Sequence, residues 1–136
     1  MTDEICLFTD GGARPTNPGP AAIGGLILDP AGKQLHSWAE RIGFHSNNEA
    51  EYLALLHGLK ICLEYTDIRV NAFTDSLLVV HQMSGHWGFK KRELRLLASE
   101  VKLASERFQE VILRHVPREH PSLKKADRLV NRAFGR

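Results

Sequence analysis

The order of strand-like and helix-like segments constrains the fold of this chain more than any other feature of its sequence. Strand-like runs bounded by turn residues occupy residues 5–9, 21–28, 34–44, 68–74 and 110–116. Apolar residues at helical spacing predict helices over residues 48–63, 76–83 and 94–108 and from about residue 122 onwards. The predicted order is therefore βββαβααβα.

This order limits how the strands can pair. The turn at residues 29–32 is short, so the second and third strands should form an antiparallel hairpin beside the first strand. Helical crossovers between the first, fourth and fifth strands should make those three parallel. The sequence thus predicts an α/β fold with a mixed sheet of five strands in the order 3-2-1-4-5.

Length and composition indicate a single globular domain. The 136 residues, of which 43% are hydrophobic, suffice for one sizeable core, so we expect one domain over residues 1–136. The longest apolar stretches fall far short of the roughly 20 residues that span a bilayer, so we expect a soluble cytoplasmic protein without membrane contact. Cys6 and Cys62 lie in apolar patterns and are predicted to be reduced core thiols. The net charge of +2 permits a nucleic-acid partner without arguing for one.

The tripeptide Phe-Thr-Asp occurs twice, each time at the end of a predicted strand. Parallel pairing of the first and fourth strands would place Asp10 and Asp75 side by side at the carboxyl edge of the sheet, about 5 Å apart. Two bare carboxylates at that distance repel by roughly 3 kcal/mol at an effective dielectric constant of about 20, and a cation between them removes the repulsion. The alternative is structural: Asp10 begins a turn with Gly11, and Asp75 or Ser76 caps the following helix.

A third carboxylate, Glu51, lies in the first turn of the helix predicted from residue 48. A glutamate at this place is usually a cap or a partner of the helix dipole. Here Ser46 and Glu49 already have the spacing of a capping box. Glu51 leads the apolar stripe that Leu55 continues, so its carboxylate should lean towards the sheet.

The fourth carboxylate, Asp127, lies on the edge of the apolar face of the last helix, between Leu123 and Val130. An unpaired carboxylate next to a core is costly, so Asp127 must have a partner. That partner is either a bound cation or one of the nearby bases of the same helix, namely Lys124, Lys125, Arg128 and Arg132.

Together these carboxylates form a set of oxygen ligands that contains no histidine or cysteine. Hard oxygen ligands suit Mg²⁺ or Mn²⁺ and disfavour Zn²⁺. Two such ions held by shared carboxylates can orient a water molecule and neutralise the leaving oxygen of a phosphodiester. The residues therefore indicate metal-dependent phosphodiester hydrolysis.

Several short motifs give nearly the whole chain a specific resemblance to type 1 ribonuclease H. They are TDGG and NPGP at residues 9–12 and 17–20, NNEAEY at 47–52, TDS at 74–76, VPRE at 116–119 and ADRLVN at 126–131. The resemblance implies the ribonuclease H-like fold, with helices on both faces of the sheet. It also implies an enzyme that cuts the RNA strand of RNA–DNA hybrids and leaves 5′-phosphate and 3′-hydroxyl ends. We further expect a monomer.

The resemblance implies roles for the acidic residues and for one histidine. It implies two Mg²⁺ ions per site when substrate is bound, with Mn²⁺ as a substitute. His120 is the candidate for a mobile histidine that assists proton transfer or product release, and a plain exposed histidine is the alternative. The family's four metal-binding catalytic positions correspond to Asp10, Glu51, Asp75 and Asp127.

The same resemblance implies substrate contacts near the first and third motifs. Gly11, Gly12 and Asn17 match positions that contact the RNA strand, and glycines let a sugar-phosphate approach closely. Asn48 matches a position that contacts the hybrid, although it can equally be read as a helix-start residue.

The chain departs from many family members after the short helix over residues 76–83. Those members insert a basic, helix-rich handle that grips the DNA strand, whereas here SGHWGFKKR, residues 84–92, leads almost directly into the next helix. Lys90, Lys91 and Arg92 cluster at the amino end of that helix, where cations oppose the dipole, which favours a phosphate contact. Arg118 is a further expected substrate contact. We expect no hybrid-binding module before Asp10, so affinity should come from this domain itself, with weak, salt-sensitive binding and distributive cleavage.

Two other functions stay open at the level of the sequence. A DNA nuclease of the same fold superfamily, such as a junction resolvase or a transposase-like enzyme, would use the same metals, although the NPGP and NNEAEY motifs favour ribonuclease H. A non-catalytic hybrid-binding domain would have kept the fold, although the presence of all four carboxylates argues against it.

Overall fold

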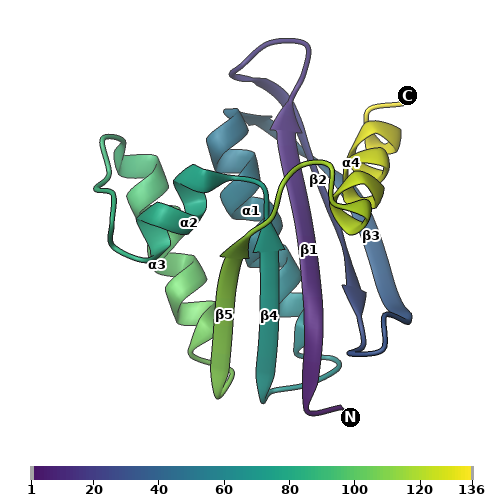
Figure 1. Cartoon of the computed structure of the whole chain (residues 1–136). Coiled ribbons are helices and arrows are strands. Elements are labelled where there is room, and N and C mark those ends of the chain that lie inside the picture. Colours follow the sequence, from purple (N-terminus) through teal and green to yellow (C-terminus); the bar gives the residue numbers. More distant parts are fainter. Residues whose placement is uncertain (1, 136) are drawn as a thin grey trace.

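The computed structural model describes residues 2–135, and its elements follow the predicted order (Figure 1). The strands are β1 (Glu4–Ala13), β2 (Gly19–Leu28), β3 (Gln34–His45), β4 (Arg69–Thr74) and β5 (Glu110–His115). The helices are α1 (Asn47–Cys62), α2 (Leu77–Met83), α3 (Arg92–Ser105) and α4 (Pro121–Ala133). Every predicted element is therefore present.

The strands form one mixed sheet in the predicted order β3-β2-β1-β4-β5. β1 pairs antiparallel with β2, and β2 pairs antiparallel with β3. β4 runs parallel to β1 and to β5, because α1 carries the chain back before β4, and α2 and α3 carry it back before β5. This topology confirms the predicted fold class.

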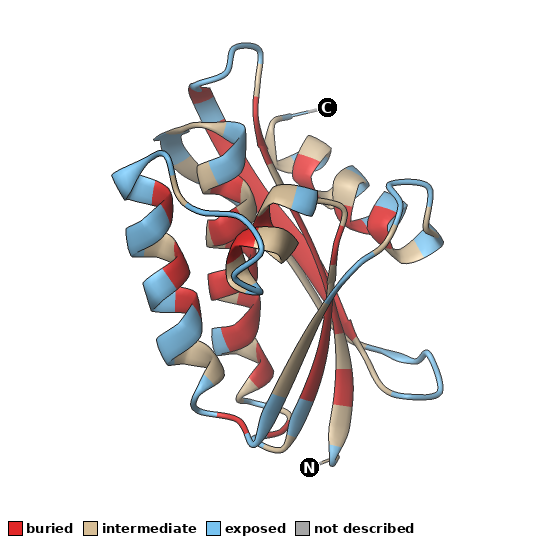
Figure 2. Cartoon of the chain, turned by 60° about the vertical axis from the view of Figure 1, so that its left-hand side comes forward, coloured by how far each residue is buried: buried red, intermediate tan, exposed pale blue. Residues whose placement is uncertain are grey.

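Helices cover both faces of the sheet. α1, α2 and α3 lie on one face, and α4 lies on the other, against β1, β2 and β3 (Figure 1). Side chains alternate along β1, so Ile5 and Leu7 enter the core on the α1 side and Phe8 enters the core on the α4 side. Figure 2 shows buried residues concentrated in the sheet and on the sides of the helices that face it. Within residues 2–135, no helix has the length and apolar character needed to cross a membrane.

α1 begins at the capping box predicted from the sequence. The Ser46 hydroxyl oxygen accepts a hydrogen bond from the Glu49 N–H at 3.1 Å, and the Glu49 carboxylate accepts one from the Ser46 N–H at 2.9 Å. Glu49 is thereby used in the cap. Glu51, two residues further on, is left for another role.

β1 extends further than its sequence indicates. We predicted that the strand ends before Asp10, whereas it runs on to Ala13. Its antiparallel pairing with β2 continues to Ala13, while its parallel pairing with β4 stops where Phe8 lies opposite Phe73. β2 thus holds the Asp-Gly-Gly segment extended, and the alternative reading of a turn at Asp10 is wrong. The other part of that alternative is confirmed, because Ser76 caps α2 by accepting a hydrogen bond from the Val79 N–H at 3.2 Å.

The two cysteines are not joined by a disulfide. Cys62 is buried at the end of α1, and Cys6 is half-buried on β1. Burial raises the pKa of both thiols, that of Cys62 to about 12, so both stay protonated at neutral pH. The prediction of unpaired thiols is confirmed, although only Cys62 belongs fully to the core.

Candidate active site

Three acidic side chains from distant parts of the chain converge at the carboxyl end of β4. Asp10 lies on β1, Glu51 on α1, and Asp75 directly after β4. One carboxylate oxygen of each residue lies within 4.8 Å of those of the other two. Strand pairing produces this arrangement, because Phe8 lies opposite Phe73 and two further residues along each chain lead to Asp10 and Asp75. The predicted grouping is confirmed for these three residues.

Close packing of α1 on β1 brings Glu51 beside Asp10. A Cβ atom at position 11 would lie 2.5 Å from the carbonyl oxygen of Ala50, which is too close for any side chain. Glycine at position 11 therefore lets the helix backbone rest on the strand. Gly11 thus has a packing role against α1, and its predicted contact with a sugar-phosphate stays a prediction.

Burial and mutual repulsion oppose ionisation of these carboxyl groups. Burial, followed by the charges of Asp75 and Asp127, raises the pKa of Asp10 to about 7. The pKa of Glu51 is raised well above its usual value, chiefly by burial and then by Asp10 and Asp75. Within residues 2–135, the buried Oε1 atom of Glu51 has no hydrogen-bond partner. A buried polar atom in this state requires a partner, such as a cation.

The chemistry of this group fits a divalent metal ion. All of its donor atoms are carboxylate oxygens, the ligands that hard divalent cations prefer. A cation here would satisfy the Glu51 oxygen and replace the repulsion among the carboxylates by attraction. Zn²⁺ would be disfavoured, because it is usually held by nitrogen and sulfur atoms.

Asp127 lies beside Asp10 but outside the group of three. Arg14, in the loop between β1 and β2, donates from Nη2 to Asp127 Oδ1 at 3.3 Å, and Asn131 donates from Nδ2 to Oδ2 at 3.4 Å. The predicted alternative, an ion pair with a base on its own helix, is therefore wrong, because the basic partner comes from a distant loop. Sequence reasoning missed Arg14, since a single arginine in a loop carries no periodic signal.

Arg118 also contacts the acidic group. Its Nε atom donates to Asp75 Oδ2 at 3.3 Å, although the arginine side chain is 84% exposed. This hydrogen bond raises the pKa of Arg118. Arg14 and Arg118 thus reach the carboxylates from two different loops and neutralise part of their charge.

His120 is the N-cap of α4. Its Nδ1 atom accepts a hydrogen bond from the Ser122 N–H at 3.1 Å, and its ring stacks on Phe8 with the ring centres 5.1 Å apart. The alternative reading of a plain exposed histidine is wrong, because the ring is half-buried and held by these contacts. A part for His120 in proton transfer stays a prediction.

Two asparagines tie the β1–β2 loop to the start of α1. Asn17 Oδ1 accepts a hydrogen bond from the Asn47 N–H at 2.9 Å, and Asn47 Oδ1 accepts one from the Ala13 N–H at 2.7 Å. Asn17 thus has a structural contact besides its predicted contact with substrate. Asn47 was missed, although its place in NNEAEY could have drawn attention to it. A Cβ atom at Gly12 would meet the Asn47 side chain at 3.5 Å, an ordinary contact.

Comparison with known proteins agrees with this geometry. Residues 8–133 match the family described as reverse transcriptase-like. The crystal structure of RNase H1 from the archaeon Halobacterium salinarum has a TM-score of 0.91 and 30% sequence identity, over 97% of this chain and 98% of that chain. The chain belongs to the type 1 ribonuclease H family.

Further ribonucleases H are similar to this chain. The RNase H domain of a Mycobacterium tuberculosis protein has a TM-score of 0.90 and 32% identity, over 98% of this chain and 95% of that chain. LC11-RNase H1, solved in complex with an RNA/DNA hybrid, has a TM-score of 0.89 and 36% identity, over 96% of each chain. Among curated proteins, a bifunctional protein of M. tuberculosis is 33% identical and ribonuclease HI of H. salinarum is 32% identical, each over 96% of this chain. The chain spans 35% of the length of the first and 64% of the second.

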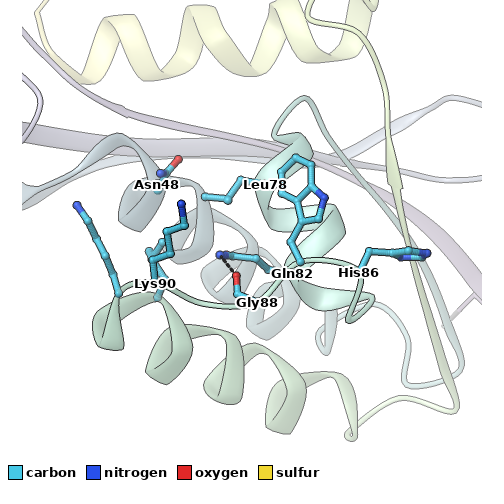
Figure 3. A pocket seen from close by; sticks show the side chains of 9 residues that line it. Asn48, Leu78, Gln82, His86, Gly88 and Lys90 are labelled. Atoms are coloured by element: carbon cyan, nitrogen blue, oxygen red, sulfur yellow. Dashed lines mark hydrogen bonds between the residues drawn. The ribbon is translucent and has the colours of Figure 1, made fainter.

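In this member of the ribonuclease H family, two of the predicted basic residues lie at a cavity of about 600 Å³ (Figure 3). Lys90 and Lys91 line it together with Asn48, whereas Arg92 is the exposed first residue of α3. Residues 84–91, between α2 and α3, contain neither helix nor strand. The expectation that the basic handle is missing is therefore confirmed.

The same cavity contains two residues that sequence reasoning missed. The buried Gln82 accepts a hydrogen bond from the Tyr52 hydroxyl at 2.8 Å and donates one to the Gly88 carbonyl at 3.2 Å (Figure 3). Trp87 also lines the cavity, and the centre of its ring lies 4.4 Å from the centre of the His81 ring. An exposed tryptophan in a glycine-containing loop could have indicated this surface, because tryptophan is enriched at binding sites.

Proposed function

We propose that this chain is an endonuclease that hydrolyses the RNA strand of RNA–DNA hybrids and leaves 5′-phosphate and 3′-hydroxyl ends. The observation that supports this most is the convergence of Asp10, Glu51 and Asp75 within 4.8 Å, around a buried Glu51 oxygen without a hydrogen-bond partner among residues 2–135. Such a group fits divalent cations. Membership of the type 1 ribonuclease H family supports a nucleic acid as the substrate of that metal chemistry.

The metal ligands of this proposal are the four carboxylates, and the ions are two Mg²⁺, with Mn²⁺ as a substitute. When bound, such ions supply an activated water and neutralise charge on the reacting phosphodiester. The chain itself fixes the oxygen ligands: β1 and the end of β4 hold Asp10 and Asp75, and α1 holds Glu51. Asp127 completes the set from α4, where Arg14 orients it.

Arg118 and His120 have supporting roles in the proposal. The exposed Arg118 can exchange Asp75 for a substrate phosphate, because a guanidinium group binds carboxylate and phosphate in the same way. The Nδ1 atom of His120 accepts the Ser122 N–H, so Nε2 carries the proton of the neutral ring. His120 would use that nitrogen to assist proton transfer or product release.

Substrate binding is assigned to two surfaces. Lys90, Lys91 and Arg92 would contact phosphates, with Asn48 at the cavity that the two lysines line. In the β1–β2 region, Gly11, Gly12 and Asn17 are the proposed contacts to the RNA strand. The similar LC11-RNase H1 has been solved with an RNA/DNA hybrid, which supports a hybrid as the partner of this chain.

A cleavage assay on labelled substrates, each with Mg²⁺ and with a chelator, tests the proposal. We expect Mg²⁺-dependent cutting of the RNA strand in a hybrid, inhibition by salt and products that are released after each cut. Preferred cutting of a DNA duplex or a four-way junction would favour a DNA nuclease instead. Hybrid binding without cleavage would favour a non-catalytic binding domain.

We also propose that the chain acts as a monomer in the cytoplasm. The converging carboxylates all come from a single chain, so the group is complete without a second copy. Light scattering of the purified protein would test the monomer, and cell fractionation would test the location. A dimer that cleaves faster than the monomer would contradict the first part.

A further inference from the structure

A cavity of about 500 Å³ lies between the β1–β2 loop, the end of β3 and the C-terminal end of α4. Its walls include the rings of Phe44 and Phe134 and the guanidinium groups of Arg14 and Arg41. None of the described residues that line it is acidic. Its lining shares no residue with the group of three carboxylates or with the cavity at Lys90.

A bulge in β3 explains why Phe44 lies on this surface. Phe44 is 69% exposed, the largest fraction among the exposed large hydrophobic residues of the described chain. Arg41 and Gly43 pair with consecutive residues of β2, so Ile42 between them is an extra residue. In a regular strand Arg41 and Phe44 would point to opposite faces. The bulge lets both of them line the same cavity.

The two arginines make this cavity cationic and connect it to the active site. Arg41 donates from Nε to the Ala133 carbonyl oxygen at 2.7 Å, so its Nη atoms are the donors that remain for an anion. Arg14 donates to Asp127 and Asn131 and lies 5.4 Å from the centre of the Phe134 ring. Arg14 therefore both lines this cavity and contacts Asp127, so the cavity lies next to that carboxylate.

We propose that the cavity binds one unpaired nucleotide of the RNA strand, where that strand continues past the active site as a single-stranded extension of the hybrid. Phe44 stacks on the base and Arg41 binds the phosphate, a combination that suits single-stranded nucleic acids. Bases inside a duplex already stack on one another, so only an unpaired base is available to Phe44. The inference rests on the proposed function, because it is the cleaved strand that passes Asp127.

Binding affinities measured in Ca²⁺, with fluorescent hybrids, test this site. The hybrids share one sequence and are blunt, extended by single-stranded RNA at either end, or extended by single-stranded DNA. The measured quantity is the ratio of the blunt Kd to the extended Kd. We expect an RNA extension to give a ratio of at least about five, because stacking of one base on an aromatic side chain contributes at least that much.

Variants of the two proposed contacts should change this ratio in different ways. Phe44→Ala should reduce it to about one, whereas Phe44→Trp should retain it, because stacking on an aromatic ring is tolerant of the ring type. Arg41→Gln should reduce it and lower the slope of log Kd against log salt by about one for the extended hybrid. Leu103→Ala is the matched control, since Leu103 is 65% exposed on α3 and lies outside this cavity. Equal melting temperatures would show that all variants are folded.

Three results would overturn the proposal. They are a ratio of one for the wild-type protein with RNA extensions, a ratio that survives in both Phe44→Ala and Arg41→Gln, and a gain from DNA extensions alone. Failure of the proposed function is seen separately, with the blunt hybrid in Mg²⁺. If the blunt hybrid is cut and an RNA extension adds nothing, only the inference about this cavity is wrong.

Discussion

The four carboxylates of the candidate active site are held in two different ways. Asp10, Glu51 and Asp75 are positioned by the sheet and by α1, and water reaches them little. Asp127 lies on α4 with its side chain 43% exposed, and Arg14, from a loop, is its cationic contact. The first three therefore depend on the packing of the core, and the fourth depends on the position of a loop.

The two kinds of support predict different effects of substitutions on activity and stability. In the buried group, solvent screens the charges poorly and the surrounding core is closely packed. A substitution there should therefore have a large effect on activity and on stability. A change at the exposed contact acts on a partly solvated ion pair, whose net contribution to stability is small. Substitutions in the buried group should therefore change both activity and stability. Substitutions at the contact with Asp127 should change activity and leave stability nearly unchanged.

Removing one charge from the buried group should have the largest effect on activity. Asp10→Asn and Asp75→Asn should each lower hybrid cleavage by at least about a thousandfold, because a metal ligand is lost where several kcal/mol of transition-state stabilisation is supplied. Binding of the hybrid in Ca²⁺ should be largely retained, which serves as the control. Without metal, both variants should melt at a higher temperature than the wild type, since repulsion among the carboxylates is relieved. Unchanged cleavage would contradict the proposed mechanism.

The packing that supports the buried group can be tested at two adjacent glycines. Gly11→Ala should lower the free energy of unfolding by about 3 kcal/mol, because the new methyl group would meet the Ala50 carbonyl and push α1 away from β1. Gly12→Ala is the matched control and should cost less than about 1 kcal/mol, since its Cβ would make only an ordinary contact. Urea denaturation measures both. A loss of less than about 1 kcal/mol in Gly11→Ala as well would show that α1 can shift at little cost.

The element order and three of the four carboxylates could be predicted because they follow from local patterns. Hydrophobic periodicity indicates the element types. Parallel pairing of β1 with β4 then places Asp10 next to Asp75, and no other contact has to be known. Local spacing also identified the capping box of Ser46 and Glu49, which left Glu51 available for another role. In each of these cases the deciding contacts are close in sequence or are set by strand register.

The missed features depend on contacts between distant segments. Asp-Gly-Gly is typical of a turn, and only its pairing with β2 shows that β1 continues to Ala13. Arg14 is joined to Asp127 across 113 residues, a contact that no spacing rule predicts. The bulge at Ile42 is invisible in the alternation of β3, although it decides which face Phe44 occupies. Tertiary partners decide each of these points.

Loss of the arginine beside Asp127 should lower activity and leave stability nearly unchanged. Arg14→Gln should lower kcat by about tenfold, because Asp127 loses its cationic contact and samples unproductive rotamers. The free energy of unfolding should change by less than about 1 kcal/mol, since the ion pair is partly exposed. Lys124→Gln, an exposed base on the same helix, is the control and should leave both values unchanged. A change in the free energy of unfolding of more than about 1 kcal/mol, in either direction, would contradict the weak, partly exposed ion pair assumed here.

The smallest of these effects is expected at His120, where a cap and a chemical role can be separated. His120→Ala should lower the free energy of unfolding by about 1 kcal/mol, because the Ser122 N–H loses its acceptor. His120→Asn should recover that stability, since asparagine is among the best N-cap residues. Both variants lack the imidazole, so if the ring assists proton transfer or product release, single-turnover and steady-state cleavage rates should stay low in both. Recovery of the rates with asparagine would mean that His120 acts only by starting α4 at the right residue, and thereby by placing Asp127 two turns further along the helix.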